Sequence, residues 1–156
     1  MQSVLMKRVA FSCLLPLVIG CASGGETDSR PIPAAWTADV QAMVGTEPGG
    51  FATVTVLPDG ETRANLTLRS GTAGGRHPWR IRERRCPGGD SEPGPVGNEV
   101  GGADDYPPLE PNEGGNASAT AILGVMLARD AEYHLDVYES EENMSVVACG
   151  DLRSTG

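Results

Sequence analysis

The stretch FATVTVLPDGETRANLTLRS, Phe51–Ser70, decides the fold because apolar and polar residues alternate on both sides of a turn. Successive side chains of a β-strand point to opposite faces, so each run has one apolar face. The turn between the runs, Pro58–Gly60, has the composition of a hairpin connection. The apolar positions of the first run are Ala52, Val54 and Val56, and those of the second run are Ala64, Leu66 and Leu68.

The same period of two recurs along the chain. Ala38, Val40 and Ala42 alternate in the first such segment. A helix over residues 119–133 is the alternative for one region, but β-branched residues and Gly124 oppose it. The sequence predicts an all-β, Greek-key antiparallel β-sandwich or flattened barrel of seven to eight strands, immunoglobulin-like in architecture. The further segments of strand length are 36–44, 76–85, 116–127, 132–140 and 143–152.

The N-terminal region has the features of a targeting segment. Lys7 and Arg8 precede a short apolar run that ends in Gly20 and Cys21. This ending resembles the lipobox of bacterial lipoproteins, which implies that Cys21 is lipidated and becomes the first residue of the mature chain. An ordinary signal peptide is the alternative. The resemblance implies a lipid-anchored (palmitate-type) protein of the bacterial envelope, in the outer membrane if the cell has two membranes.

The sequence then divides into four parts. We expect a signal peptide at 1–20, a lipidated flexible tether at 21–35, one domain at 36–152 and a tail at 153–156. The tether is polar and contains Gly, Ser and Pro, which is typical of a flexible linker. The domain has the length for one modest hydrophobic core.

Net charge argues against one class of partner. The chain carries a formal net charge of −9. Loss of residues 1–20 removes two basic residues, Lys7 and Arg8, so the charge falls by two to −11 and no lysine remains. Phosphates are repelled by such a chain, so we expect no nucleic-acid binding. The expected membrane contact is the lipid on Cys21.

The cysteines predict one disulfide. Of the four cysteines, Cys13 would leave with the signal peptide and Cys21 would carry lipid. Two then remain in an exported domain, where thiols are oxidised. We therefore predict a bond between Cys86 and Cys149, the alternative being two free thiols.

The densest positive charge lies in HPWRIRERRC, His77–Cys86. If this segment is a strand, Trp79 and Ile81 face the core, and the arginines at positions 80, 82 and 84 point outward. In the segment 132–140, Asp136 and Tyr138 share one face, opposite Leu135 and Val137. We expect Asp136 to meet Arg80 or Arg82 in an Arg–Asp–Tyr cluster; the alternative is that these arginines are solvated and unpaired. Residues 87–115, rich in Gly, Pro and acids, are expected to form a long loop.

At these residues the chain resembles the copper/zinc superoxide dismutases, especially their bacterial lipoprotein branch. The order of GGRHPWRIRE (74–83), a cysteine shortly after it, DDYPPL (104–109) and VVACGDL (146–152) is similar to that family. The resemblance implies a superoxide dismutase-like β-barrel. It also implies that the segment at 79–83 occupies the place of the family's His-Val-His strand.

The departures from the family concern its metal ligands. Arg80 and Arg82 stand where the resemblance places two copper-ligating histidines, and Tyr138 stands near the third ligand position. His77 matches a structural histidine, and His134 lies away from the ligand position. A guanidinium stays protonated and has no lone pair to donate, so we expect no copper, no zinc and no other cofactor. The loop carboxylates Asp104, Asp105 and Glu110 are expected to be solvated.

Two classes of function follow from these residues. The first is a catalytically inactive, membrane-anchored superoxide dismutase-like lipoprotein, a pseudoenzyme with a structural or binding role in the envelope. It could hold a small anion or an acidic protein partner through a patch of Arg80, Arg82, Arg84 and Asp136. The alternative is a residual superoxide dismutase-type oxidoreductase that uses ligands the resemblance does not identify.

Overall fold

The computed structural model describes residues 33–87 and 97–155. Cys21, the expected signal peptide and most of the expected tether lie outside these residues. None of the helical structure in the described part is long and apolar enough to cross a membrane. The elements are β1 (Ala35–Ala42), β2 (Gly49–Val56), β3 (Thr62–Arg69), β4 (Trp79–Glu83), the 3-10 helix η1 (Ala103–Asp105), β5 (Ala117–Leu123), β6 (Tyr133–Tyr138) and β7 (Val146–Ser154).

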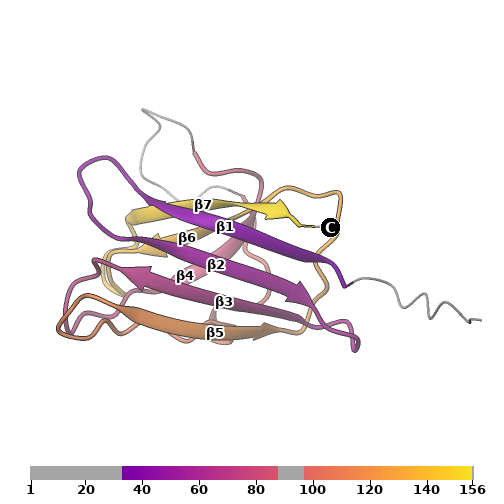
Figure 1. Cartoon of the computed structure of the whole chain (residues 1–156), viewed down its shortest axis with the longest axis horizontal. Coiled ribbons are helices and arrows are strands. Elements are labelled where there is room, and N and C mark those ends of the chain that lie inside the picture. The colour runs from indigo at the N-terminus through magenta and orange to yellow at the C-terminus, as the bar shows by residue number, and fades with distance from the viewer. Residues whose placement is uncertain (1–32, 88–96, 156) are drawn as a thin grey trace, which may run out of the picture. The chain divides into compact units, whose positions relative to one another are not determined.

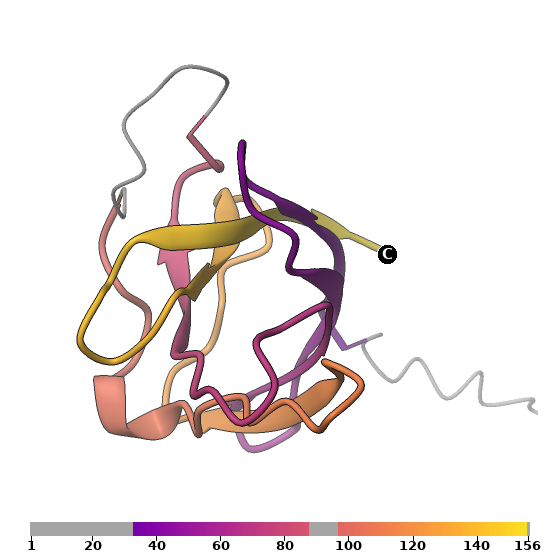
Figure 2. The ribbon, with the colours of Figure 1, turned by 90° about the vertical axis from the view of Figure 1, so that its left-hand side faces the viewer.

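The seven strands form one antiparallel sheet in the order β4-β6-β7-β1-β2-β3-β5 (Figure 1). The connections from β3 to β4, β4 to β5 and β5 to β6 each cross between the two ends of this order. The sheet curls strongly, so that β4, β6 and β7 face the other strands across the core (Figure 2). The predicted all-β fold class is confirmed.

The hairpin of β2 and β3 has the register that the alternation requires. Val56 pairs with Thr62 next to the turn, and Gly49 pairs with Arg69 at the far end. The Asp59 carboxylate accepts a hydrogen bond from the Glu61 amide at 3.1 Å, and Gly60 adopts a φ of +89°, which favours glycine. All six apolar side chains predicted to face inward are buried.

Ala42 departs from the predicted pattern in β1. Ala38 and Val40 are buried, whereas Ala42 is exposed although it has the same parity. Ala42 is the last residue of β1, and the chain turns at Val44 and Gly45. The strand therefore runs past the margin of the core before it ends. At the other end of the domain, β7 includes Arg153 and Ser154, which the sequence assigned to the tail.

The curl of the sheet centres on β7, which pairs with β6 on one side and β1 on the other. The contact with β1 has two parts, at Gln41–Ala42 and at Trp36–Thr37. Between them lies Gly150, where a Cβ atom would be 2.8 Å from the Asp39 carbonyl oxygen. Glycine therefore permits the close approach of the β7 backbone to β1 at this position.

A disulfide joins Cys86, just after β4, to Cys149 in β7. Because β6 lies between β4 and β7, the bond crosses over one strand of the sheet. The Cys86 amide also donates a hydrogen bond to the Asp151 carboxylate at 2.7 Å. The predicted bond thus holds the edge strand β4 to the centre of the sheet.

Replacing both Cys86 and Cys149 by alanine is expected to lower the free energy of unfolding by about 3–5 kcal/mol, because the bond constrains a long loop of the unfolded chain. Urea titration of oxidised wild type and the double variant measures the difference. Reduced wild type should match the variant. Full labelling of both thiols after denaturation without reductant would contradict the bond.

Candidate functional site

The candidate site lies on the face of β4 opposite the core. Trp79 and Ile81 are fully buried against the core, as alternation predicts, and Arg80 and Arg82 lie on the other face. Arg84 does not join them. It follows the end of β4, adopts a φ of +79° and is exposed. The predicted set of three arginines on one strand face is therefore corrected to two.

The described part of the long loop covers this face. Val100 N donates to the Ile81 carbonyl and Glu83 N donates to the Asn98 carbonyl, each at 2.9 Å. The segment beside β4 therefore pairs with it like an additional strand. Gly97 permits the approach, since a Cβ there would overlap the Glu83 carbonyl. The Arg82 guanidinium donates to the Gly97 carbonyl at 2.9 Å.

This covering changes the environment of both arginines. The side chain of Arg80 is 12% exposed and that of Arg82 is 15% exposed. The Arg80 guanidinium also lies 5.3 Å above the centre of the Tyr106 ring, within the range of a cation–π contact. The alternative of solvated, unpaired arginines therefore does not hold for these two residues.

Each of the two arginines faces a carboxylate. Glu99, from the covering segment, lies between them, with its oxygens 3.3 Å from Arg80 Nε and 3.7 Å from Arg82 Nη2. Arg82 Nε is also 3.6 Å from Asp136 Oδ2, and Asp136 is fully buried. Two positive and two negative groups thus balance within the protein. We call Arg80, Arg82, Glu99 and Asp136 the charge network.

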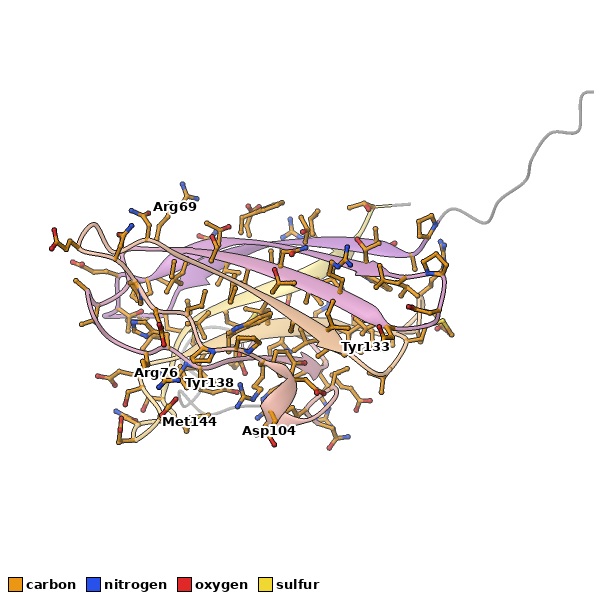
Figure 3. All side chains as sticks on the ribbon, turned by 90° about the horizontal axis from the view of Figure 1, so that it is seen from below. Arg69, Arg76, Asp104, Tyr133, Tyr138 and Met144 are labelled. Carbon is orange, nitrogen blue, oxygen red and sulfur yellow. A yellow bond between two sulfur atoms is a disulfide. The ribbon has the colours of Figure 1, made fainter. Side chains whose placement is uncertain are left out.

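Tyr138 completes the network at the end of β6. Arg82 Nε donates to the Tyr138 hydroxyl at 2.9 Å, and this hydroxyl lies 3.4 Å from Asp136 Oδ2. Burial raises the pKa of Tyr138, while the Arg82 hydrogen bond opposes the rise. Arg82 and Tyr138 are in direct contact, and Arg80 joins them through Glu99. Figure 3 shows Tyr133 and Tyr138, the two ends of β6, toward opposite ends of the sheet.

His134 belongs to the same face, which the sequence interpretation missed. It is fully buried, pairs in register with Arg82, and has Nε2 3.4 Å from Asp136 Oδ2. Its Nδ1 lies 2.9 Å from the Arg84 carbonyl oxygen and donates to it. The available signal was alternation, because His134, Asp136 and Tyr138 occupy every second position of β6.

The surroundings of His134 favour its charged form. Burial by itself lowers the pKa of an imidazole, but the Asp136 carboxylate and the Arg84 carbonyl raise it more. The pKa of His134 therefore lies above its ordinary value of 6.5. Asp136 therefore lies between the Arg82 guanidinium and the His134 imidazole. This imidazole stays charged up to a higher pH than an ordinary histidine.

His77 has a structural environment. Its Nε2 accepts a hydrogen bond from the Thr72 amide at 3.2 Å, so the ring proton lies on Nδ1, which donates to the Tyr138 carbonyl at 3.0 Å. The backbone of His77 also pairs with Leu109 in both directions. These bonds attach the covering loop to the sheet and use both ring nitrogens.

One possible metal-ligand group occurs among the described residues: His134, Asp136 and Cys149. Cys149 is in the disulfide, and a disulfide sulfur is not the thiolate that metal ions bind. The loop carboxylates do not form such a group in the described ranges. Asp105 instead accepts from the Gly102 amide at 2.8 Å, and Glu110 lies 3.5 Å from Arg76.

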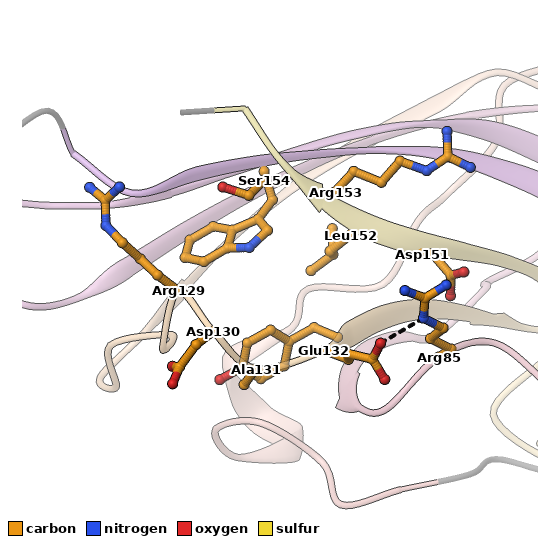
Figure 4. Close-up of a pocket in the computed structure, with 11 residues that line it drawn as sticks. Arg85, Arg129, Asp130, Ala131, Glu132, Asp151, Leu152, Arg153 and Ser154 are labelled. Atoms are coloured by element: carbon orange, nitrogen blue, oxygen red, sulfur yellow. Dashed lines mark hydrogen bonds and ion pairs between the residues drawn. The ribbon is translucent and has the colours of Figure 1, made fainter.

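A separate hollow of about 370 Å³ lies at the end of the sheet where β6 begins (Figure 4). Its arginines are interspersed with acids, and Arg85 forms an ion pair of 2.8 Å with Glu132. Both of these side chains are well exposed. The charged residues lining it are Arg85, Arg129, Arg153, Asp130, Glu132 and Asp151.

The fold and site together define a disulfide-bonded, all-antiparallel β-domain with a buried charge network on one face. Comparison with models of protein families and with curated proteins found no match to this chain.

Replacing Asp136 by alanine is expected to lower the free energy of unfolding by about 3–5 kcal/mol, because Arg82 would stay buried without this counter-charge. Replacing Glu132 by alanine is the matched control, since it removes an exposed ion pair and should change stability little. Urea denaturation measures both. If both variants lost the same unfolding free energy, the buried network would contribute no more to stability than an exposed ion pair, and the prediction would be wrong.

The raised pKa of His134 predicts a pH-dependent contribution to stability. The contribution is fully present below the unfolded-state pKa of about 6.5 and is lost as pH rises through the higher folded-state value. The difference in unfolding free energy between wild type and His134→Gln should therefore shrink from pH 5.5 toward alkaline pH. Denaturation series of both proteins measure it, and a difference independent of pH would refute the assignment.

Proposed function

We propose that this protein is a non-catalytic, lipid-anchored module of the bacterial envelope with a superoxide dismutase-like domain. The observation that carries the proposal is the position of the Arg82 guanidinium. It contacts Tyr138 and Glu99 and lies 3.6 Å from Asp136, on the strand face where the resemblance places copper. Arginine stays protonated and has no lone pair with which to bind a metal ion, so Arg82 cannot replace a copper-ligating histidine there.

Three structural relationships support the superoxide dismutase-like part of the proposal. β4 and β6, which carry the three positions aligned with copper ligands, are neighbours in the sheet. The disulfide connects the end of β4 to the last strand, as the resemblance implies. The sheet is antiparallel throughout and strongly curled. All three relationships concern the arrangement of the strands, whereas the residues at the ligand positions differ from those of the family.

The lack of copper ligands extends beyond the two arginine positions to the rest of this face of β4 and β6. Glu99 neutralises both arginines, and the segment around it covers them. His77 uses both ring nitrogens in hydrogen bonds to the backbone. Within the described ranges, the only other imidazole is His134, whose Nδ1 is bonded to the Arg84 carbonyl, so this face leaves one imidazole nitrogen, His134 Nε2, for a metal. Copper cycling between oxidation states needs several imidazole ligands, which this face does not provide.

The role of such a module would be structural, or the binding of a partner. Lipid on Cys21 would hold the domain at a membrane, with residues 21–35 as the tether. An acidic partner or small anion would have Arg84 as its accessible contact, since it is exposed. Arg80 and Arg82 would bind such a partner only if it displaced Glu99. The second candidate function, a residual superoxide dismutase-type oxidoreductase, would need metal bound by the oxidised protein.

A metal analysis decides between these two functions. The full chain, purified in detergent with its disulfide intact, incubated with copper and zinc and then desalted, is expected to retain well under one equivalent of either metal, because arginines occupy the expected ligand positions. Elemental analysis measures the content, and a superoxide-dismutation assay accompanies it. Stoichiometric copper together with dismutation activity would overturn the proposal in favour of the oxidoreductase.

A further inference from the structure

Three potential ligand side chains, one of them Asp136 of the charge network, meet on β6 and β7. The ligand atoms of His134, Asp136 and Cys149 all lie within 4.8 Å of one another, and all three residues are buried. Asp136 and Cys149 are direct cross-strand neighbours on β6 and β7. His134 lies two residues before Asp136, so their side chains share one face. The backbone register therefore sets the spacing of the group.

Two atoms of this group make no hydrogen bond. His134 Nε2 and Asp136 Oδ1 are buried without a hydrogen-bond partner, although Nε2 lies at ion-pair distance, 3.4 Å, from Asp136 Oδ2. Asp136 Oδ2, by contrast, lies near Arg82, Tyr138 and His134. Buried polar atoms nearly always have a partner, and an exception calls for an explanation such as an ion. The two atoms without a hydrogen bond belong to two of the three side chains in the group.

The orientation of His134 is that of a metal ligand. Its Nδ1 donates to the Arg84 carbonyl, so the neutral ring has its lone pair on Nε2, the atom that makes no hydrogen bond. Metal-ligating histidines commonly donate their other ring N–H to a backbone carbonyl in this way, which sets both tautomer and ring orientation. The one missing element in the oxidised protein is a thiolate, because Cys149 is bonded to Cys86.

We propose that reduction of the Cys86–Cys149 disulfide turns this group into a zinc site with His134, Asp136 and Cys149 as ligands. A dithiol reductant supplies two electrons and two protons, its own thiols form a disulfide, and the Cys86–Cys149 bond becomes two thiols. On binding Zn²⁺, the Cys149 thiol releases its proton to solvent, and so does His134 Nε2 when the ring is charged. A disulfide oxidant reverses the step: it is reduced to two thiols while the Cys86–Cys149 bond re-forms and the ion is released, so metal binding follows the redox state of the disulfide.

The ligand set and charge suit zinc. Zinc binds thiolate, imidazole and carboxylate together in tetrahedral sites. One thiolate and one carboxylate neutralise Zn²⁺, and Arg82 keeps its contact with the other Asp136 oxygen. The fourth position is left to water or to Cys86. This site is distinct from the positions aligned with copper ligands, of which it uses none.

The test uses full-length chains that carry Cys13→Ser and Cys21→Ser, so that Cys86 and Cys149 are their only cysteines. Cys86→Ala frees Cys149 without any reductant, and the matched control Cys149→Ala breaks the same disulfide but removes the ligand. Titration with Zn²⁺ against a chromophoric chelator should give about one equivalent for Cys86→Ala and none for Cys149→Ala. Cobalt as a probe should give a thiolate-to-metal absorption band in the first variant only.

Wild type provides the second measurement if either variant unfolds. It should bind zinc after treatment with a dithiol and lose it on reoxidation, and His134→Gln should abolish binding in the reduced form. Equal zinc binding by Cys86→Ala and Cys149→Ala, or no binding by reduced wild type, would overturn the site. Copper or zinc retained by the oxidised protein would instead contradict the proposed non-catalytic function, so the two failures are distinguishable.

Discussion

The buried carboxylate of Asp136 is the constraint on which the rest of this face depends. A carboxylate removed from water is strongly unfavourable unless positive and hydrogen-bonding groups surround it. Here Arg82 approaches from β4, the Tyr138 hydroxyl from the same strand face, and His134 from two residues earlier. The charge on Asp136 thus explains why polar residues line one face of a strand that is buried on both sides.

The two arginines of the charge network also depend on how the edge of the sheet at β4 is protected. An exposed edge strand offers unpaired backbone groups to other chains, and proteins usually protect it. The segment that carries Glu99 pairs with β4 and places a carboxylate between Arg80 and Arg82. The same segment therefore covers the edge and balances the charge. Gly97 makes this possible, because any side chain there would meet the Glu83 carbonyl.

The disulfide links the charge network to the proposed zinc site. It crosses over β6, ties the edge strand to β7, and occupies the sulfur that lies beside His134 and Asp136. In the oxidised protein the charged side chains of this face are paired with one another, and Arg82 offers no atom that can bind a metal. Whether the Cys86–Cys149 disulfide is oxidised or reduced then decides whether the Cys149 thiolate joins the His134 imidazole and the Asp136 carboxylate.

The sequence by itself determined the strands, their inward faces, and the cysteines that pair, because strand alternation and cysteine number are local properties of the chain. It also placed Arg80, Arg82, Asp136 and Tyr138 on the faces where they are found. The place of His134 on the same face as Asp136 also follows from alternation along its strand, although the sequence interpretation missed it. The tertiary structure alone decided that Glu99 lies between the arginines and that Arg84 leaves the strand. These depend on cross-strand register and on how a loop packs, which a period of two along one strand does not encode.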